Sequence, residues 1–264
     1  MAAPVLVVWK SRILVDEALR QPVLLPRETH EGGSDFIDLD RASDGKTQLD
    51  LEPTQLANLR FIDPMFELGR FEATTRLAIV RALALSRWSA ETRFCSNCGA
   101  PLRWETPGTV KLCENSEEPH RHFPRIDPAT IMLVHDVRRM LLGRQPGWPE
   151  GMYSTLAGFI DAGESAEAAV AREVMEEAGV SVADVSYFGS EAWPFPRSLM
   201  LGFFAKATSN EIVRGDELED VRWFDLEEGL RLERALAERV PHADTIARRL
   251  IGRWLRERTA CAPR

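Results

Sequence analysis

Three glutamates on one predicted helix are the residues whose types and spacing point most clearly to chemistry. Residues 166–177 have helical spacing, and Glu173, Glu176 and Glu177 stand at positions i, i+3 and i+4, so their carboxylates share one face. Like charges on one face destabilise a helix unless a cation lies among them. Hard divalent cations such as Mg²⁺ bind carboxylate oxygens together with substrate phosphates. The spacing therefore predicts a metal site for a phosphorylated substrate.

The residues around these glutamates are expected to hold the helix and its loop in place. Ser165 is expected to cap the helix with half of a capping box, and Gly179 to end it. Arg172 is expected to hold Glu164 or Glu173 in position. A solvated acidic face, the usual explanation of a charge run, accounts for the glutamates. It does not account for the glycines at both ends or for the arginine.

A cysteine cluster forms a second candidate site. A C-x-x-C pair is followed by one further cysteine at the separation of a second pair, which is the pattern of a zinc ribbon. The second pair is incomplete because Ser116 stands where its last cysteine would be, so a histidine is expected to complete the site, with His122 or Glu118 as substitutes. A ribbon that folds without metal and a redox pair are the alternatives. The predicted zinc ligands are Cys95, Cys98, Cys113 and His120.

Composition narrows the class of protein. The 264 residues are 44% hydrophobic and 28% charged, with a formal net charge of −8. These values are typical of a globular protein and disfavour nucleic-acid binding through a bulk basic surface. The apolar runs are far shorter than the roughly 20 residues of a membrane-spanning helix, and no basic residues precede the apolar start. We therefore expect a protein of the reducing cytoplasm, whose cysteines are not in disulfides.

Three stretches of chain are expected to position these groups. Residues 1–92 mix short apolar runs with an acidic, turn-rich middle and form an N-terminal domain, and residues 93–124 hold the cysteine cluster. From 125 to 258 strands and helices alternate, which predicts an α+β class. The predicted helices are 70–88, 166–177 and 245–258, and the predicted strands of the last stretch are 131–135, 139–144, 199–207 and 221–224.

The glutamate helix and the loop before it resemble the Nudix box, G-x5-E-x7-R-E-U-x-E-E-x-G-U, where U is a bulky aliphatic residue. Nudix enzymes hydrolyse a nucleoside diphosphate linked to another moiety, with metal-assisted attack of water on phosphorus. The resemblance implies a Nudix α/β/α sandwich, preceded by a zinc ribbon and a smaller mixed α/β N-terminal domain. The residues that fill the box are Gly158, Glu164, Arg172, Glu173, Val174, Glu176, Glu177, Gly179 and Val180.

A second motif, at residues 190–200, narrows the resemblance. Its W-P-F-P core is expected to be a rigid extended segment that presents aromatic rings, with a proline-rich surface loop or a polyproline docking ligand as alternatives. It resembles the S-Q-P-W-P-F-P-x-S array of the NADH pyrophosphatase branch, which also has a zinc ribbon and an F-P-R-x-D-P segment, here residues 123–128. Glu191 and Ala192 replace the Gln-Pro of the array. This change is expected to alter hydrogen bonding and rigidity at the entry to the nicotinamide-side pocket. The added carboxylate is expected either to weaken binding of a dianionic pyrophosphate or to shift the preference between the reduced and oxidised forms.

What this resemblance implies is hydrolysis of NADH or NAD⁺ to AMP and the nicotinamide mononucleotide, and removal of an NAD cap from RNA. Phe123 and Phe159 match positions that sandwich the adenine from two chains, which implies a homodimer. The implied catalytic residues are Glu173, Glu176, Glu177, Arg172 and Glu164. The implied ligands of Mg²⁺ or Mn²⁺ are the Ala157 carbonyl, Glu173, Glu176, Glu177 and Glu217. The implied substrate-binding residues are Phe123, Phe159, Glu191, Ala192, Trp193, Pro194, Phe195, Pro196, Arg197, Ser198 and Ala247.

Two alternatives stay open. The first is a Nudix hydrolase for ADP-ribose or another dinucleotide. The second is a module without turnover that senses NAD or binds RNA, which the intact glutamates and the net charge of −8 disfavour. NAD-capped RNA is still a candidate substrate, since a pocket that reads only the cap needs just a local patch for the strand, such as Arg121, Arg125 and Arg197.

Overall fold

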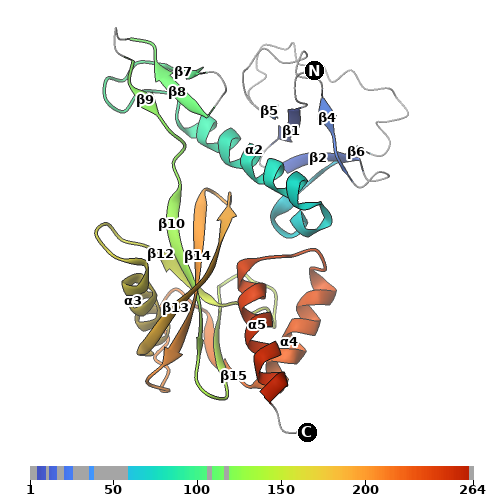
Figure 1. The fold of residues 1–264 in the computed structure, drawn as a ribbon, viewed down its shortest axis with the longest axis vertical. Helices are drawn as coiled ribbons and strands as arrows, with labels where there is room; N and C mark the ends of the chain where they lie inside the picture. Colours follow the sequence, from blue (N-terminus) through green and yellow to red (C-terminus); the bar gives the residue numbers. More distant parts are fainter. Residues whose placement is uncertain are drawn as a thin grey trace. The chain divides into compact units, whose positions relative to one another are not determined.

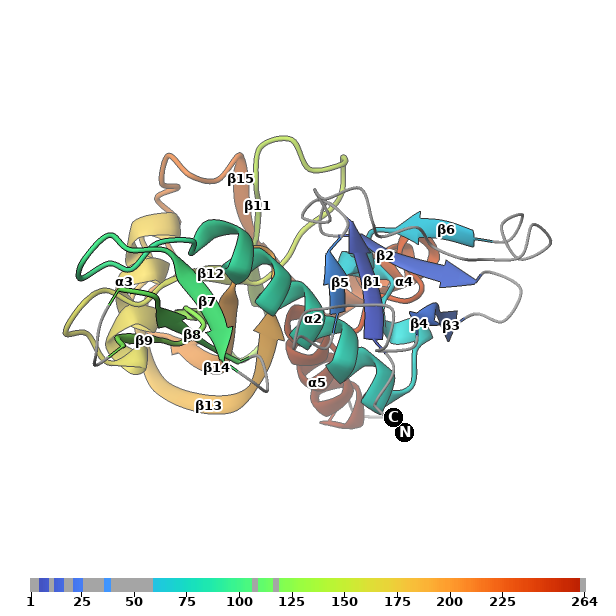
Figure 2. The same cartoon turned by 90° about the horizontal axis from the view of Figure 1, so that it is seen from above.

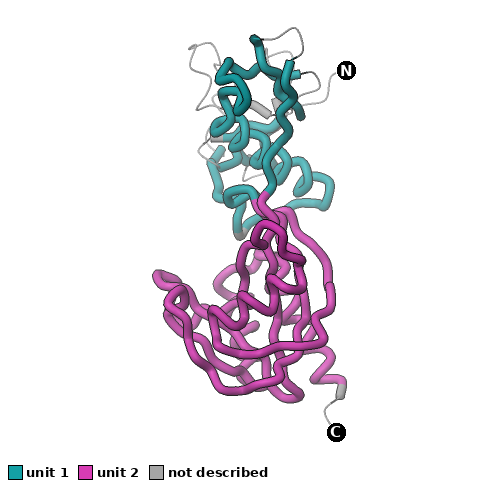
Figure 3. The backbone as a smooth tube through the Cα atoms, turned by 90° about the vertical axis from the view of Figure 1, so that its left-hand side faces the viewer, with its two compact units in different colours: residues 1–126, 194–197 teal, residues 127–193, 198–264 magenta. Residues whose placement is uncertain are grey.

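The strands of the described residues form three separate sheets. The computed structural model describes residues 5–9, 12–16, 21–25, 36–38, 59–105, 109–115 and 119–261. The chain divides into two compact units, coloured separately in Figure 3: unit 1 is Met1–Ile126 with Pro194–Arg197, and unit 2 is Asp127–Trp193 with Ser198–Arg264. The expected domain boundaries at 92 and 124 both lie in unit 1 and stay predictions.

In the part of unit 1 that the structure describes, a six-stranded sheet and a long helix share a core. Leu6 and Ile13 of the sheet are buried together with Ile79 and Trp88 of the helix. The helix, α2, occupies Ala73–Glu91, which confirms the helix predicted over 70–88. It begins later than predicted because a 3₁₀ turn precedes it, and it also ends later. The strands are β1 (Val5–Trp9), β2 (Arg12–Asp16), β3 (Gln21–Pro22), β4 (Leu24–Leu25), β5 (Phe36–Asp38) and β6 (Leu59–Ile62), and the 3₁₀ turns are η2 (Pro64–Phe66) and η3 (Leu68–Arg70).

A small antiparallel sheet follows α2 in unit 1. Its strands are β7 (Leu102–Glu105), β8 (Val110–Cys113) and β9 (Arg121–His122). Lys111 of β8 is buried, and its Nζ donates to the Ser89 carbonyl at 3.0 Å and the Thr92 carbonyl at 2.7 Å. A cation is favourable at the carbonyl end of a helix, so this lysine ties the small sheet to the end of α2.

Unit 2 is a mixed sheet covered by helices on both faces. Its strand order is β13-β14-β10-β11-β15, and β12 pairs with β10. Helix α3 lies on one side of this sheet, and α4 and α5 lie on the other (Figures 1 and 2). The strands are β10 (Asp127–His135), β11 (Met140–Arg144), β12 (Leu156–Phe159), β13 (Val182–Trp193), β14 (Ser198–Ala207) and β15 (Asp220–Phe224), and the helices are α3 (Ala166–Ala178), α4 (Leu226–Arg239) and α5 (Ile246–Cys261).

Strand β10 shows how the sequence builds the two layers. Ile131 and Leu133 belong to the cluster that packs against α4 and α5, whereas Met132 and Val134 belong to the cluster that packs against α3. Successive side chains of a strand point to opposite faces, so a continuous apolar run is what a strand covered on both sides requires.

The elements of unit 2 confirm the predicted α+β class and the predicted strands and helices, with ends that differ by a few residues. Strands β12 and β13 and helix α4 were not predicted. In the part of the chain that the structure describes, there is no helix with the length and apolar character needed to cross a membrane.

Candidate active site and metal centres

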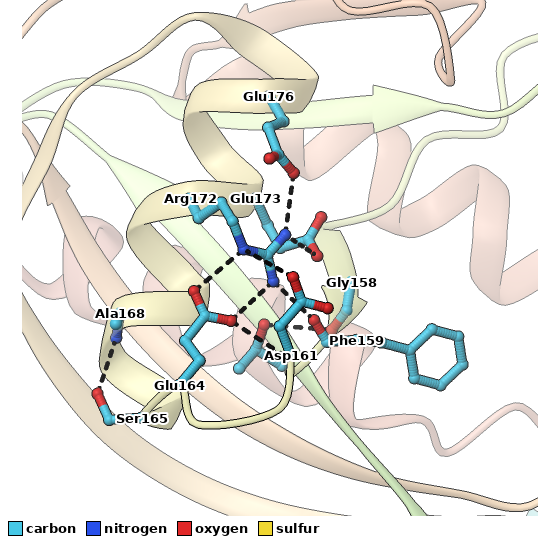
Figure 4. A network of polar contacts seen from close by, with 10 residues as sticks. Gly158, Phe159, Asp161, Glu164, Ser165, Ala168, Arg172, Glu173 and Glu176 are labelled. Carbon is cyan, nitrogen blue, oxygen red and sulfur yellow. Dashed lines mark hydrogen bonds and ion pairs between the residues drawn. The ribbon is translucent and has the colours of Figure 1, made fainter.

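Arg172 is the centre of the polar network on α3 (Figure 4). Its guanidinium donates to both carboxylate oxygens of Glu164 at 3.0 and 2.8 Å, to Glu173 at 2.8 Å and to Glu176 at 2.9 Å. It also donates to the backbone carbonyl of Phe159 at 2.8 Å. The prediction that Arg172 holds Glu164 or Glu173 is confirmed for both. One side chain therefore ties the loop before α3 to two carboxylates of the helix.

The two ends of α3 are closed as the sequence predicts. Ser165 accepts a hydrogen bond from the Ala168 amide at 3.2 Å, which is the expected half of a capping box. Gly179 ends the helix with φ at 68°, a left-handed conformation that glycine adopts at little cost. These caps fix the register of the helix and therefore the direction of its glutamates.

Gly158 is needed because the Glu173 carboxyl group lies directly against the backbone of β12. A Cβ atom at residue 158 would lie 1.8 Å from the carboxyl carbon of Glu173. Only glycine permits this approach. The Glu173 side chain is buried, and burial raises the pKa of its carboxyl group. A carboxylate buried in this way has lost much of its solvation, so a nearby cation stabilises its charged form.

Glu177 is the carboxylate whose surroundings best fit a bound cation. Its side chain is only 4% exposed, and among the described residues its Oε2 is buried without a hydrogen-bond partner. Burial, followed by the negative charges of Glu173 and Glu217, raises the pKa of Glu177 to about 8. The amide of Ala157 acts in the opposite direction. A divalent cation bound among these oxygens would coordinate the unpaired Oε2 of Glu177 and also balance the excess negative charge. The donor set therefore fits Mg²⁺ or Mn²⁺.

The structure brings together most of the predicted carboxylate site. Glu217, in the segment before β15, raises the pKa of both Glu173 and Glu177 by its charge, so its carboxylate lies within electrostatic range of theirs. Glu176 is exposed and pairs with Arg172. The amide of Ala157 faces Glu177, and the role of the Ala157 carbonyl as a metal ligand stays a prediction.

The W-P-F-P segment has a different shape from the one predicted. Residues up to Trp193 belong to strand β13, Ser198 begins β14, and the two residues pair across the hairpin. The four residues between them form a turn, not a continuous extended segment. Phe195 packs against the core of unit 1, and Arg197 pairs with Glu91 at 2.5 Å. The predicted substrate contacts of the turn residues stay predictions.

Glu191 has a structural partner that the sequence did not reveal. Its carboxylate accepts a hydrogen bond from the Ile246 amide, at the start of α5, at 2.6 Å, and Arg249 lies 3.6 Å away. Burial raises the pKa of this carboxyl group. Glu191 therefore caps α5, which also carries Ala247, and the expectation that its charge weakens pyrophosphate binding stays untested.

The Glu191 cap gives a testable contrast between two substitutions. Burial raises the folded-state pKa of Glu191 above its unfolded value, so this group's contribution to stability is fully present below the unfolded pKa. It is lost as the pH rises through the folded pKa. E191Q keeps an acceptor for Ile246 without the charge, and we expect it to be at least as stable as wild type at pH 8. E191A leaves the amide without its cap and is expected to lose about 1 kcal/mol. Thermal melts from pH 4 to 8 measure both, and an E191Q protein that melts well below E191A would contradict this role.

The cysteine cluster of unit 1 gathers the four predicted zinc ligands. Their ligand atoms, from Cys95, Cys98, Cys113 and His120, all lie within 4.8 Å of one another. Cys98 Sγ lies 3.3 Å from Cys113 Sγ, and Cys95 Sγ lies 3.5 Å from His120 Nδ1. Thiolates bound at about 2.3 Å around a tetrahedral Zn²⁺ need separations of this order. The residues therefore fit zinc.

His122 is a close second choice for the histidine ligand. Its Nε2 lies 3.3 Å from Cys95 Sγ, yet it is not part of the compact group of four. Glu118, the other substitute, lies outside the described residues. The arrangement favours His120 as the fourth ligand and leaves His122 beside the site.

Two of the three arginines suggested for an RNA strand pair with acidic residues. Arg121 pairs with Glu105 at 2.7 Å, and Arg197 pairs with Glu91. Arg125 also has an interaction partner. A phosphate would have to compete with carboxylates here, so this patch attracts an RNA backbone less than three unpaired arginines would.

Residues 125–248 match the family model of the NUDIX domain, so this part of the chain is a Nudix domain. Over about two thirds of its length the chain is similar to proteins named NAD-capped RNA hydrolase NudC. It is 44% identical over 176 residues to the one from Pseudomonas aeruginosa strain LESB58, covering 66% of this chain and 60% of that protein. It is 46% identical over 165 residues to the one from Mycobacterium tuberculosis strain H37Ra, covering 61% of this chain and 52% of that protein.

These matches confirm the resemblance to the NAD-directed branch of the Nudix family, and they leave part of each relative uncovered. The matched region spans between about half and two thirds of the length of the relatives named above. Among solved structures, a NUDIX hydrolase from Nitrosomonas europaea aligns with a TM-score of 0.49 and 23% identity, covering 65% of this chain and 95% of that one.

Proposed function

We propose that this protein is a metal-dependent hydrolase that cleaves the pyrophosphate of NADH or NAD⁺ to AMP and nicotinamide mononucleotide, and that removes NAD caps from RNA. The observation that carries the proposal is the buried oxygen of Glu177, which has no partner among the described residues. This glutamate lies in a Nudix box, and the negative charges of Glu173 and Glu217 act on it. The relatives named NAD-capped RNA hydrolase support NAD as the group recognised.

In this proposal the chain's own residues form a rigid, negatively charged metal-binding site. Glu173, Glu176, Glu177 and Glu217, with the carbonyl of Ala157, would hold Mg²⁺ or Mn²⁺. When bound, such a cation polarises phosphate oxygens and neutralises the charge of the leaving group. Arg172 keeps Glu164 and the helix carboxylates in register through the network of Figure 4. One of the three helix glutamates orients or deprotonates the attacking water.

Phe123 and Phe159 support a stacking role in this proposal. Both aromatic side chains are largely exposed, at 65% and 55%, which suits rings that bind a planar base. They lie in different units of the chain, and a homodimer would let one subunit supply each ring. The zinc ribbon has a structural role in the proposal, and a reducing cytoplasm keeps its thiols available for the metal.

The experiment that tests this function identifies the bond that breaks. NADH is incubated with the protein and Mg²⁺ or Mn²⁺, and the products are separated by chromatography. We expect AMP and reduced nicotinamide mononucleotide. Release of nicotinamide would show cleavage of a different bond, and tight NADH binding without turnover would favour the sensor.

NAD-capped RNA is tested against free NAD in the same assay. Because Arg121 and Arg197 are engaged by carboxylates, we expect the cap to be recognised with little help from the strand. The rates on capped RNA are then expected to depend only weakly on salt. A steep fall in capped-RNA turnover with salt, absent for free NAD, would point to a strand-binding surface elsewhere on the molecule.

A further inference from the structure

The segment 208–219, between β14 and β15, is fastened at both of its ends. At its start the Thr208 amide donates to the Ser181 carbonyl at 2.8 Å, and the Ser181 amide donates to Ser209 Oγ at 3.0 Å. At its end Leu218 is buried in the α3-side core, and the Glu219 amide donates to the Arg144 carbonyl at 2.8 Å. The middle of the segment, which leads to Glu217, is placed by contacts of its own.

Those contacts are made with the last turn of α3. The Val213 amide donates to the Ala178 carbonyl at 2.9 Å, and the Gly215 amide donates to the Glu177 carbonyl at 3.0 Å. The last carbonyls of a helix have no partner within the helix, so the segment supplies two of the donors that α3 lacks. The two chains lie backbone against backbone at this point.

Gly215 makes this close approach possible. A Cβ atom at residue 215 would lie 2.2 Å from the carbonyl oxygen of Glu176 and 3.3 Å from the Cα of Glu177. The first distance is far inside contact range, and its partner is a backbone atom in a helix, which cannot move aside as a flexible side chain can. Gly179 serves the same junction, since a Cβ there would lie 2.7 Å from Cβ of Val213.

We propose that Gly215 is a positioning residue of the carboxylate site: by letting the 208–219 segment lie flat on α3, it brings Glu217 to Glu173 and Glu177. The inference rests on the proposed function, because Glu217 matters only if these carboxylates share a divalent cation. Glu217 follows Gly215 by two residues, so a displacement of the backbone at Gly215 is passed almost directly to it.

The test measures metal affinity and not only turnover. Mn²⁺ is titrated into the full-length protein, and the free ion is followed by electron paramagnetic resonance. G215A is expected to weaken Mn²⁺ binding on the order of tenfold, because the new methyl group pushes Glu217 away from its partners. G252A is the matched control. It also adds one methyl group, in α5, where the nearest atom is the flexible end of Arg256 at 3.2 Å, and it is expected to bind Mn²⁺ as wild type does.

A double variant separates positioning from general damage. If Gly215 acts only through Glu217, G215A combined with E217Q binds Mn²⁺ no more weakly than E217Q alone. V213P tests the same junction through another atom, since it removes the amide that donates to the Ala178 carbonyl. If circular dichroism shows that G215A is not folded, V213P provides the test instead. It is expected to weaken Mn²⁺ binding in the same direction.

The results that overturn the inference differ from those that overturn the function. Wild-type Mn²⁺ affinity in folded G215A, or fully additive losses in the double variant, would overturn the role of Gly215. A wild-type protein that binds Mn²⁺ but hydrolyses no NADH would contradict the proposed function, while the comparison of G215A with G252A would still decide the role of Gly215.

Discussion

Replacing Glu177 with glutamine is expected to stabilise the protein in the absence of added divalent cations and to lower kcat on the order of a hundredfold or more. Both effects have one cause. Burial, with the charges of Glu173 and Glu217, raises the pKa of Glu177 to about 8, and its Oε2 has no partner among the described residues. The folded-state pKa lies above the unfolded value, so the stability that protonation gives is fully present below about pH 4.5. It is lost as the pH rises through about 8.

E177Q is neutral at every pH and avoids that loss. The difference in melting temperature between E177Q and wild type, measured without Mg²⁺, is therefore expected to grow from pH 5 to pH 9. E176Q is the matched control, because Glu176 is largely exposed and pairs with Arg172; it is expected to lose activity without gaining stability. An E177Q protein that is less stable than wild type at pH 9, or that turns over NADH at the wild-type rate, would contradict the role given to this carboxylate.

Loss of the zinc centre is expected to have the second large effect, on stability and not on chemistry. Cys95 is buried and lies within 3.5 Å of both His120 and His122, so C95S removes a central ligand. A structural zinc ion contributes its binding energy to folding. We expect C95S to lose bound zinc and to melt on the order of 10 °C lower, with little change in kcat below the melting range.

The two histidine variants sharpen this prediction. H120A is expected to lose zinc as C95S does, whereas H122A is expected to keep it, and the metal content of purified protein distinguishes them. Zinc retained by H120A and lost by H122A would exchange the roles of the two residues. An unchanged melting temperature in C95S would mean that the ribbon folds without metal.

The parts that could be predicted from the sequence depend on short-range signals. The Ser165 cap, the Gly179 terminus and the spacing of Glu173 and Glu177 all lie within one helix and its ends, and each is found where it was expected. Helix α4 begins with a signal of the same kind. Asp225 and Glu228 form a complete capping box at its start.

The parts that could not be predicted depend on contacts between distant segments. Glu191 caps a helix that begins 55 residues later in the chain, and nothing near Glu191 identifies that partner. Gly215 is surrounded by polar residues typical of a loop, and its need for glycine becomes visible only when the carbonyl of Glu176 lies beside it. The turn at Phe195 looked extended because prolines restrict φ locally, whereas the pairing of Trp193 with Ser198 sets the shape of the hairpin.

The most direct test of the central claim compares kcat/KM for NADH and ADP-ribose in the presence of Mg²⁺ or Mn²⁺. Both substrates offer a pyrophosphate to the same carboxylates, so the ratio isolates recognition of the nicotinamide half. We predict a clearly higher kcat/KM for NADH, with AMP and reduced nicotinamide mononucleotide as products. Faster hydrolysis of ADP-ribose would contradict NAD(H) as the substrate while retaining the Nudix chemistry, and no hydrolysis of either would contradict the proposed activity itself.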